Sequence, residues 1–258
     1  MSSNLPHNAF AQAIRRIALR AGEEIMRVYQ TPFEVRSKDD RSPVTAADEA
    51  AEQLIAEELR RLSPSLPVVA EETVAKGHVP DVGNNPYWLV DPLDGTKEFV
   101  SRNGEFTVNI GLIENARPTI GVVYAPAVGR MFWNSSTTEA FAERDGGAPT
   151  RISARKPASD GFVVVASRSH RDHDTDEYLA TLKVKSITSA GSSLKFCLVA
   201  AGEADLYPRF GTTNEWDTAA GHAVLLAAGG RVVTREGDEM MYAKPKFRNP
   251  GFIAKGRT

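Results

Sequence analysis

Residues 88–96 (WLVDPLDGT) constrain this chain more than any other stretch. An apolar strand ends there in two carboxylates, Asp91 and Asp94, and the chain then turns through Gly95. Pro92 lacks a backbone donor and sharpens the turn, while glycine accepts backbone angles that other residues resist and lets a ligand approach the main chain. Two acidic side chains at this spacing can face the same cation. An Asp-x-x-Asp is also common in solvated turns, so its setting decides between the two interpretations.

The composition is that of a soluble globular protein. Its 258 residues are 41% hydrophobic and 8% aromatic, which is enough for one large domain or two closely packed halves. The 31 basic and 33 acidic side chains nearly balance, so nothing draws the protein as a whole to nucleic-acid backbones or anionic membranes. An anionic substrate must therefore be attracted locally.

The sequence favours a reducing compartment. The single cysteine, Cys197, lies among apolar residues, so we expect a buried, inert thiol rather than a nucleophile. Residues 1–10 lack a basic region followed by an apolar core, and no apolar run approaches the roughly 18 residues that span a bilayer. We expect a cytoplasmic protein without an integral membrane segment, and leave peripheral association with the inner membrane open.

Hydrophobic spacing predicts helices and strands in both halves of the chain. Apolar residues at three- and four-residue intervals predict a helix through 10–25 and a second one from near Thr45 to Leu62. Alternation and short apolar runs predict strands, an antiparallel meander among them, at 68–70, 87–90, 106–113, 120–124, 131–133 and 140–142. Beyond a polar stretch at 145–149, strands at 162–166 and 184–188 alternate with helices at 174–182, 192–201 and 217–228.

Four acidic residues at the ends of predicted elements are candidates for a magnesium site. Glu71 follows a strand, Asp91 and Asp94 flank the turn, and Asp217 begins a helix. Magnesium prefers oxygen ligands and pairs with substrate phosphates, so a phosphoryl-transfer site needs several carboxylates from separate elements. A structural interpretation stays open: Asp217 is then a first-turn acid favoured by the helix dipole, and Glu71 or Glu72 is a solvated loop acid.

Thr45 and Thr96 each allow two interpretations. Thr45 with Asp48 matches a capping box, in which the threonine caps the first turn and the acid reaches back to it, although the acid could also help to orient a water. Thr96 follows Asp-Gly and could cap a helix, with its hydroxyl and nearby backbone donors available to a phosphate.

Four motifs in this order resemble the inositol monophosphatase superfamily of Mg-dependent, lithium-sensitive phosphatases. They are residues 44–48 (VTAAD), 71–72 (EE), 88–96 (WLVDPLDGT) and 216–221 (WDTAAG). The resemblance covers nearly the whole chain and implies an α/β (α+β) fold, the αβαβα layered sandwich of the inositol monophosphatase and fructose-bisphosphatase type. Residues 1–258 then form one unit. Its half 1–148 carries a largely antiparallel sheet and the metal site, and its half 149–258 carries the substrate-specificity elements.

The resemblance implies a metal site and a mechanism. Two or three Mg²⁺ ions would be bound by four carboxylates and the backbone carbonyl of Leu93. A metal-activated water, oriented by Glu71 and by Thr96 with Asp48 behind it, would attack phosphorus in line without a phosphoenzyme. The metal ligands implied are Glu71, Asp91, Leu93, Asp94 and Asp217. The substrate-binding residues implied are Glu71, Leu93, Asp94, Gly95, Thr96, Gly191, Ser192, Lys195, Arg209 and Asp217.

Further segments resemble the CysQ-type 3'(2'),5'-bisphosphate nucleotidases within this superfamily. They are residues 97–99 (KEF), 102–109 (RNGEFTVN), 167–170 (SRSH), 191–199 (GSSLKFCLV) and 206–211 (LYPRFG). Inositol-specific relatives carry a glutamate at the position of Arg209, whereas arginine offers planar donors matched to phosphate. Lys195 adds a second cation. Either residue could instead be a surface charge or a structural salt-bridge partner.

The expected reaction is hydrolysis of adenosine 3',5'-bisphosphate to AMP and phosphate, with 3'-phosphoadenylyl sulfate as an additional substrate, which would link the enzyme to sulfur assimilation. Alternatives are an inositol monophosphate or fructose 1,6-bisphosphate phosphatase of the same fold, and a noncatalytic protein that senses a phosphorylated metabolite. Arg209 argues against inositol, and the intact acidic set argues against a sensor. The expected partner is a small phosphorylated nucleotide rather than a nucleic acid, and the sequence allows a monomer or a homodimer.

Overall fold

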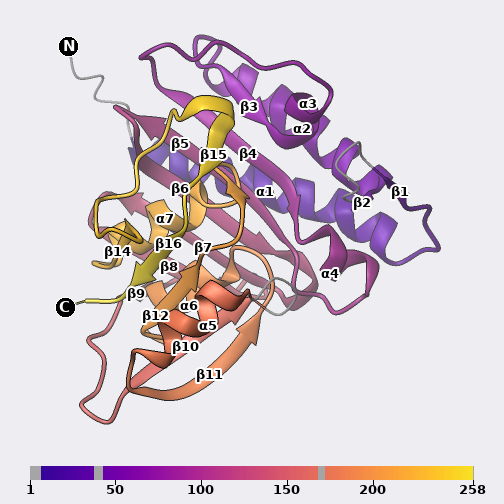
Figure 1. Ribbon diagram of the computed structural model, residues 1–258. Coiled ribbons are helices and arrows are strands. Elements are labelled where there is room, and N and C mark those ends of the chain that lie inside the picture. Colours follow the sequence, from indigo (N-terminus) through magenta and orange to yellow (C-terminus); the bar gives the residue numbers. More distant parts are fainter. Residues whose placement is uncertain (1–6, 38–42, 168–171, 258) are drawn as a thin grey trace.

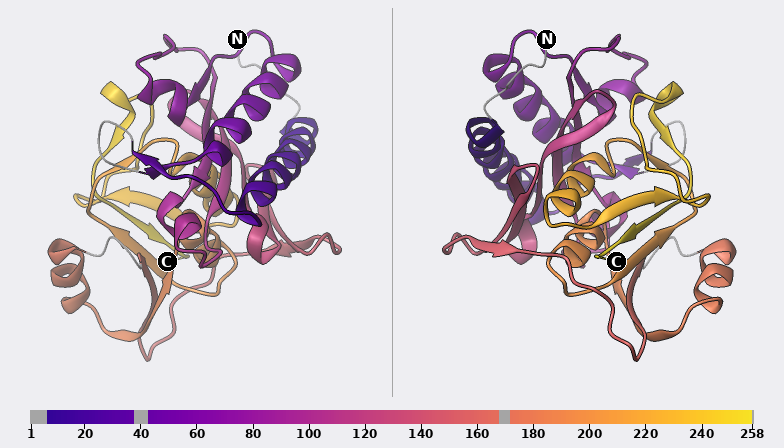
Figure 2. Two further views of the ribbon diagram at one scale, coloured as in Figure 1. Left: turned by 90° about the vertical axis from the view of Figure 1, so that its right-hand side faces the viewer. Right: turned by 90° about the vertical axis from the view of Figure 1, so that its left-hand side faces the viewer.

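Two β-sheets, with helices outside and between them, build the protein (Figure 1). The computed structural model describes residues 7–37, 43–167 and 172–257. Along the stack, helices α1 and α2 cover a seven-stranded sheet, helices α6 and α7 lie between the two sheets, and α5 covers a five-stranded sheet. Figure 2 shows α1 and α5 on opposite sides of the molecule. This arrangement confirms the expected layered α/β fold.

The two N-terminal helices, α1 (His7–Tyr29) and α2 (Ala46–Leu62), pack against each other and against the larger sheet. The predicted apolar stripe of α1 is buried, from Phe10 to Ile25. Helix α2 begins with the predicted capping box, in which the hydroxyl of Thr45 accepts the backbone N–H of Ala47 and Asp48 reaches back to the backbone of Thr45. Both helix predictions are confirmed.

The larger sheet has the strand order β3-β4-β5-β6-β7-β8-β9, and only β3 and β4 are parallel neighbours. Its strands are β3 (Val68–Ala70), β4 (Tyr87–Asp94), β5 (Thr107–Glu114), β6 (Arg117–Ala125), β7 (Arg130–Ser136), β8 (Glu139–Arg144) and β9 (Thr150–Ile152). The predicted meander is confirmed. Strand β4 continues beyond its predicted end at Val90, with a register irregularity between Asp91 and Asp94. The division of the chain at residue 148 stays a prediction.

The smaller sheet has the strand order β11-β10-β12-β16-β14. Its strands are β10 (Phe162–Ser167), β11 (Val184–Ala190), β12 (Leu206–Arg209), β14 (Arg231–Thr234) and β16 (Phe252–Lys255). Strand β10 is parallel to β11 and β12, and β16 is antiparallel to β12 and β14. The sequence revealed β10 and β11 but not the other three strands, whose residues (LYPR, RVVT and FIAK) show no alternation of apolar and polar side chains. The predicted alternation of strand and helix holds as far as α7, and the strands that follow α7 were not predicted.

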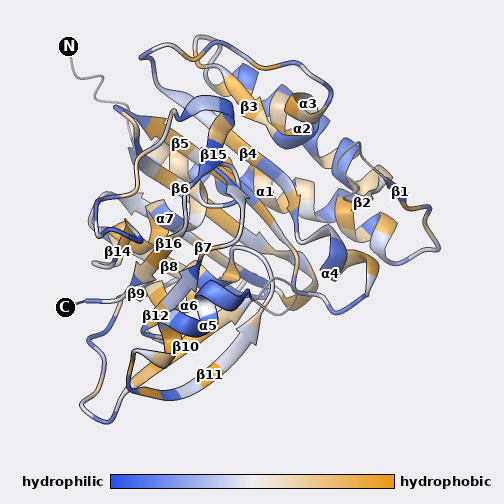
Figure 3. Ribbon diagram, in the orientation of Figure 1, coloured by the Kyte–Doolittle hydropathy of each residue, from blue (hydrophilic) through white to orange (hydrophobic). Residues whose placement is uncertain are grey.

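The middle layer contains α6 (Leu194–Ala200) and α7 (Ala219–Ala227). Helix α7 packs so closely on the larger sheet that a Cβ atom on Gly121 would lie 2.3 Å from the carbonyl oxygen of Ala220. The predicted start at Asp217 was two residues early, so this acid precedes the first turn instead of lying in it. The outer helix α5 (His173–Ala180) places Leu179 in an apolar cluster with the smaller sheet, and the rest of the helix is mostly hydrophilic (Figure 3).

Short elements complete the fold. They are β1 (Arg36–Ser37), β2 (Pro43–Val44), α3 (Glu71–Ala75), α4 (Thr96–Val100), β13 (Thr213–Asn214), β15 (Arg248–Asn249) and the 3-10 turns η1 (Pro126–Val128) and η2 (Pro245–Phe247). Strands β13 and β15 pair antiparallel just before α7. In the parts of the chain that the structure describes, no helix combines the length and the apolar character needed to cross a membrane.

Candidate active site

A cavity of about 360 Å³ brings most of the predicted site residues together. This volume lies in the range of small-molecule sites in proteins. The predicted residues that line it are Glu71, Asp91, Leu93, Asp94, Gly95, Thr96, Ser192, Lys195, Arg209 and Asp217. Nine residues that were not predicted as site residues also line it. Six of them lie in the resembling segments, namely Lys97, Glu98, Ser167, Phe196, Tyr207 and Thr218, and Thr212, Thr213 and Asn214 lie outside these segments. Among the predicted residues, Asp48 and Gly191 do not line the cavity.

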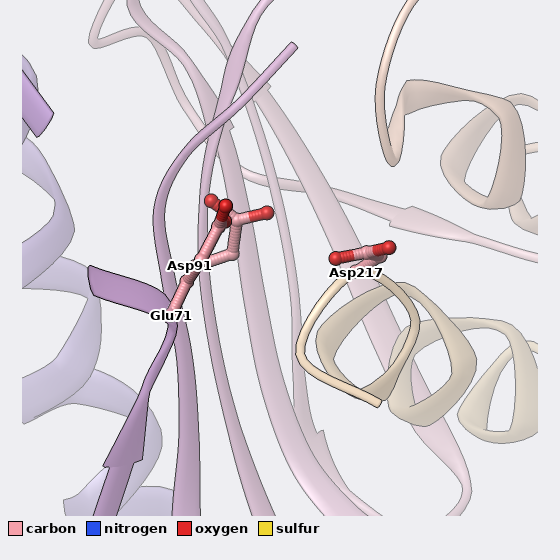
Figure 4. A group of neighbouring side chains, drawn as sticks. All are labelled: Glu71, Asp91 and Asp217. Atoms are coloured by element: carbon pink, nitrogen blue, oxygen red, sulfur yellow. The ribbon is translucent and has the colours of Figure 1, made fainter. Parts of the chain in front are cut away.

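Three of the four predicted carboxylates form a tight cluster. One oxygen each from Glu71, Asp91 and Asp217 lies within 4.8 Å of the others. Parallel pairing of Ala70 with Val90 places the next residues, Glu71 and Asp91, side by side where β3 and β4 leave their shared register. In Figure 4, Asp217 faces these two acids from the turn that leads into α7.

The electrostatics of this cluster suit a cation. Burial raises the pKa of Asp217 well above its usual value, and the negative charges of Asp94 and Glu71 raise it further. Burial also raises the pKa of Asp94, although the positive charge of Lys195 opposes the rise. Carboxylates that are buried or half-buried and repel one another offer hard oxygen ligands and are stabilised by a divalent cation, so the side chains present fit a metal site.

Asp94 lies in the same cavity but is held by hydrogen bonds. Its Oδ2 accepts the hydroxyl of Ser193 at 3.0 Å and the amide of Asn109 at 3.4 Å. The Ser193 hydroxyl also lies 2.7 Å from the backbone carbonyl oxygen of Asp217. Ser193 is buried, and it lies in the resembling segment 191–199 but was not among the predicted site residues.

Asp48 and Thr96 join the capping box to the cavity. The hydroxyl of Thr96 donates to Asp48 Oδ1 at 3.3 Å, with the carbonyl of Leu93 at the same distance. Asp48 Oδ2 accepts the backbone N–H and the hydroxyl of Thr45. Oδ2 of Asp48 therefore serves the capping box, and Oδ1 accepts the hydroxyl of Thr96. Asp48 can cap the helix and hold Thr96 at the same time. Thr96 itself does not cap α4, because Gly95, with φ 88°, is the capping residue and Thr96 begins the helix.

The loop 191–193 fastens the second half of the chain to the turn after β4. The hydroxyl of Ser192 lies 2.7 Å from the carbonyl oxygen of Asp94 and 2.8 Å from that of Glu105. Gly191 donates its N–H to the carboxylate of Glu105 at 2.9 Å. A Cβ atom on Gly95 would lie 2.2 Å from the hydroxyl oxygen of Ser192, so this contact requires glycine. The structure therefore gives Gly191 a packing contact beside the cavity.

Two cations also reach the cavity. The buried ammonium group of Lys195 donates to the carbonyl oxygens of Ala190 at 3.2 Å and Ser192 at 2.6 Å, so it supports the loop 191–193. Burial lowers the pKa of Lys195 to about 8, against the raising effect of Asp94. Arg209 ends β12, and its charge opposes the rise in the pKa of Asp217. Residues 168–170 of the resembling segment SRSH lie outside the described residues.

Glu52 is a second residue that sequence reasoning missed. Its carboxylate accepts the backbone N–H of Glu72 at 2.7 Å and the hydroxyl of Thr73 at 2.6 Å, so it fixes the start of α3, where Glu71 lies. Glu72 is buried and is not a solvated loop acid. A glutamate on the helical pattern of α2 gave no signal in the sequence, because the contact joins residues that are twenty positions apart.

Cys197 is buried as expected. Burial raises the pKa of its thiol, which disfavours the reactive thiolate.

Comparison with known proteins places the chain in a family. A model of the inositol monophosphatase family matches residues 7–255. The 3'(2'),5'-bisphosphate nucleotidase CysQ of Salmonella typhimurium is 49% identical over 244 residues, which cover 93% of this chain and 97% of that protein. The nucleotidase of the same name from Escherichia coli strain K12 is 50% identical over 240 residues, with coverage of 92% and 96%.

A solved structure agrees with these matches. The crystal structure of CysQ from Bacteroides thetaiotaomicron, described as a bacterial member of the inositol monophosphatase family, matches with a TM-score of 0.81 at 39% identity and covers 97% of this chain and 98% of that one. The resemblance seen in four ordered motifs is thereby confirmed in sequence and in fold. The chain belongs to the inositol monophosphatase family.

Proposed function

We propose that this chain is a metal-dependent 3'(2'),5'-bisphosphate nucleotidase that hydrolyses the 3'-phosphate of adenosine 3',5'-bisphosphate and releases AMP and phosphate. The observation that carries this proposal is a cavity that is lined by both carboxylates and cationic side chains. The carboxylates of Glu71, Asp91 and Asp217 cluster in it, and the cations Lys195 and Arg209 line it as well. Relatives that bear this name share about half of the sequence.

The proposed cofactor is Mg²⁺, two or three ions, held by the side chains of Glu71, Asp91, Asp94 and Asp217 and the carbonyl of Leu93. The tight cluster supports three of these ligands, and Asp94 lies close enough to raise the pKa of Asp217. Bound magnesium would supply positive charge against the phosphate oxygens and lower the pKa of a water.

The protein groups position the reacting atoms. We assign to Thr96 the orientation of the attacking water, because its hydroxyl is itself held by the buried carboxylate of Asp48. Glu71, which lines the same cavity, would also orient this water. Gly95 and Thr96 would hold the scissile phosphate, and the contact of Ser192 with the carbonyl of Asp94 fixes the turn that carries them. Since phosphoryl transfer is catalysed mostly by positioning and charge, such an arrangement suffices without a covalent intermediate.

The second phosphate of the substrate is assigned to Arg209 and Lys195. Arginine binds phosphate through two parallel N–H donors, and Arg209 lies at the end of a strand with its side chain in the cavity wall. Lys195 contributes charge, although two carbonyl oxygens already accept hydrogen bonds from its ammonium group. Gly191 and Ser192 complete the proposed binding set. A sulfated analogue, 3'-phosphoadenylyl sulfate, would be accepted in the same way, which would place the enzyme in sulfur assimilation.

A panel of substrates tests the function. Phosphate release should be fastest from adenosine 3',5'-bisphosphate, slower from inositol 1-phosphate and fructose 1,6-bisphosphate, and abolished by a chelator; added Li⁺ should inhibit it. Preference for inositol 1-phosphate or fructose 1,6-bisphosphate would refute the nucleotidase assignment and leave a phosphatase. No release from any of the three with Mg²⁺ present would refute enzymatic function and favour a noncatalytic sensor.

A further inference from the structure

Gly211 leaves room for two charged groups to approach each other beside the cavity. A Cβ atom built on Gly211 would lie 2.9 Å from Oδ2 of Asp172, and 3.6 Å from both Cζ and Nε of Arg209. The carboxylate of Asp172 and the guanidinium of Arg209 therefore border the same small space, which any side chain at position 211 would fill. Neither Asp172 nor Gly211 belongs to the proposed metal or phosphate site.

Asp172 is held in place by the helix that it caps. Its Oδ1 accepts the backbone N–H of Thr175 at 2.8 Å and closes the first turn of α5. The helix is fixed to the chain beyond Arg209, because the ring of Tyr178 packs edge-on against that of Phe210 with centroids 5.5 Å apart. With Oδ1 committed to the cap, Oδ2 is the oxygen that borders the space beside Gly211, which the guanidinium of Arg209 borders as well.

The positive charge of Arg209 lowers the pKa of Asp172. Burial alone would raise the pKa of Asp172, but hydrogen bonds from Thr175 and the positive charge of Arg209 outweigh it, and the pKa is lowered. On another side, Nη2 of Arg209 donates to the carbonyl oxygen of Thr212 at 3.3 Å, and Thr212 also lines the cavity. The guanidinium thus has an anionic neighbour and a carbonyl acceptor that restrict where it can point.

We propose that Asp172 is a positioning residue that holds Arg209 in the cavity wall and thereby sets the preference for substrates with a second phosphate. This inference rests on the proposed nucleotidase function. An arginine side chain loses rotamer entropy when it is fixed, and a neighbour that fixes it beforehand reduces the loss that accompanies binding. A carboxylate beside arginine also weakens its attraction for phosphate. The proposal holds that positioning outweighs this neutralisation.

The test uses variants that keep the helix cap. Asn and Ser are good N-caps, so Asp172→Asn and Asp172→Ser remove the charge and leave α5 closed. Gly211→Ala keeps Asp172 but adds a methyl group that displaces its carboxylate. Asp174→Asn is the matched control, since it removes an exposed acid from the first turn of the same helix, where Asp174 pairs with Arg235. Each full-length variant is assayed at saturating Mg²⁺ with adenosine 3',5'-bisphosphate and with adenosine 3'-monophosphate.

For Asp172→Asn, Asp172→Ser and Gly211→Ala, KM for the bisphosphate should rise about tenfold, as expected when one charged partner is lost. The kcat value should stay within about twofold, and the kinetics with the monophosphate should not change. In an Arg209→Ala background, Asp172→Asn should have no further effect, because its partner is already gone. Asp174→Asn should behave like the wild type.

Four results would overturn the proposal: a lower KM in Asp172→Asn, equal losses for both substrates, additive effects of Asp172→Asn and Arg209→Ala, or an unchanged preference for the bisphosphate in the variants. A lower KM would mean that the carboxylate only neutralises Arg209. If the proposed nucleotidase function itself is wrong, the wild type will show no preference for the bisphosphate, which distinguishes this failure from a failure of the role of Asp172. A wild-type preference that survives at Asp172→Asn and Gly211→Ala would refute the role of Asp172 alone.

Discussion

The hydroxyl of Ser193 lies 3.0 Å from Oδ2 of Asp94, although the two residues are 99 positions apart in the chain. The same hydroxyl lies 2.7 Å from the carbonyl oxygen of Asp217. The buried side chain of Ser193 therefore contacts both the acid that ends β4 and the backbone of the acid that precedes α7. This geometry ties the two halves of the proposed metal site together.

Removing this hydroxyl should weaken metal binding. In Ser193→Ala, Asp94 loses a donor that orients its carboxylate, and loss of such an outer partner reduces metal affinity by about 10- to 100-fold. Calorimetric titration with Mg²⁺ measures this without relying on turnover. Ser189→Ala, at an exposed position of β11, is the control and should bind Mg²⁺ normally. Unchanged affinity in Ser193→Ala would mean that the contact with Asp94 has no part in metal binding.

Replacing Asp217 should stabilise the metal-free protein and abolish its response to metal. Asn can still accept the backbone N–H of Asn214, which donates to Asp217 Oδ2 at 2.8 Å, while the repulsion from Asp94 and Glu71 disappears. In EDTA, Asp217→Asn should melt about 2–4 °C above the wild type, which corresponds to about 1 kcal/mol. Added Mg²⁺ should raise the melting temperature of the wild type only. A lower melting temperature in EDTA would show that repulsion is not the dominant effect at this acid.

Thr96 and Asp48 should act on the chemical step. In Thr96→Val the shape is kept but the hydroxyl that donates to Asp48 is lost, so kcat should fall by about 10²- to 10⁴-fold. Mg²⁺ affinity should change little, because the side chain of Thr96 is not a proposed ligand. Thr96→Ser keeps the hydroxyl and should retain most of the activity. If valine and serine at this position have the same kcat, the hydroxyl does not orient the nucleophile.

His222 should make the protein sensitive to acid. Its Nδ1 lies 3.1 Å from the hydroxyl of Tyr242, and burial, helped by the positive charges of Lys244 and Arg117, lowers its pKa to about 3. An unfolded histidine titrates near 6.5, so the unfolded chain gains a proton that the folded one cannot accept. This contribution to folding stability is fully present above pH 6.5 and is lost progressively as the pH falls toward 3.

Protonation of His222 in the unfolded chain should reduce the free energy of unfolding by up to about 1.4 kcal/mol per pH unit in this range. In His222→Asn, whose amide can still bond to the hydroxyl of Tyr242, the loss of melting temperature between pH 7 and pH 5 should be smaller than in the wild type. The comparison uses each protein's own change between the two pH values, so a lower starting stability of the variant does not affect it. Equal changes in both proteins would assign the acid sensitivity to other groups.

Much of the fold could be predicted because its longer elements have clear periods. The apolar stripe of α1, the capping box at Thr45 and the alternation along β5 are local properties of the sequence. Strands β12, β14 and β16 were missed, since their residues show no alternation of apolar and polar side chains and their strand form depends on pairing within one sheet. The start of α7 was misplaced for a related reason, because local preference does not fix where the first turn begins.

The candidate site could be predicted as a set of residues but not as a geometry. Glu71 and Asp91 are neighbours because β3 and β4 are parallel and in register, which no spacing in the sequence reveals. The contact of Ser193 with Asp94 and that of Glu52 with Glu72 depend on tertiary structure alone. For the same reason, the sequence indicated Lys195 as a phosphate ligand and gave no sign that its ammonium group donates to the carbonyl oxygens of Ala190 and Ser192.

The products formed from adenosine 3',5'-bisphosphate test the central claim most directly. The wild-type protein with Mg²⁺ is incubated with this compound, and nucleotide products are separated by chromatography and quantified together with phosphate. We predict one phosphate per substrate and adenosine 5'-monophosphate as the nucleotide product, with none formed in a chelator. Formation of adenosine 3'-monophosphate, or release of phosphate at the same rate in the chelator, would contradict a metal-dependent 3'-nucleotidase.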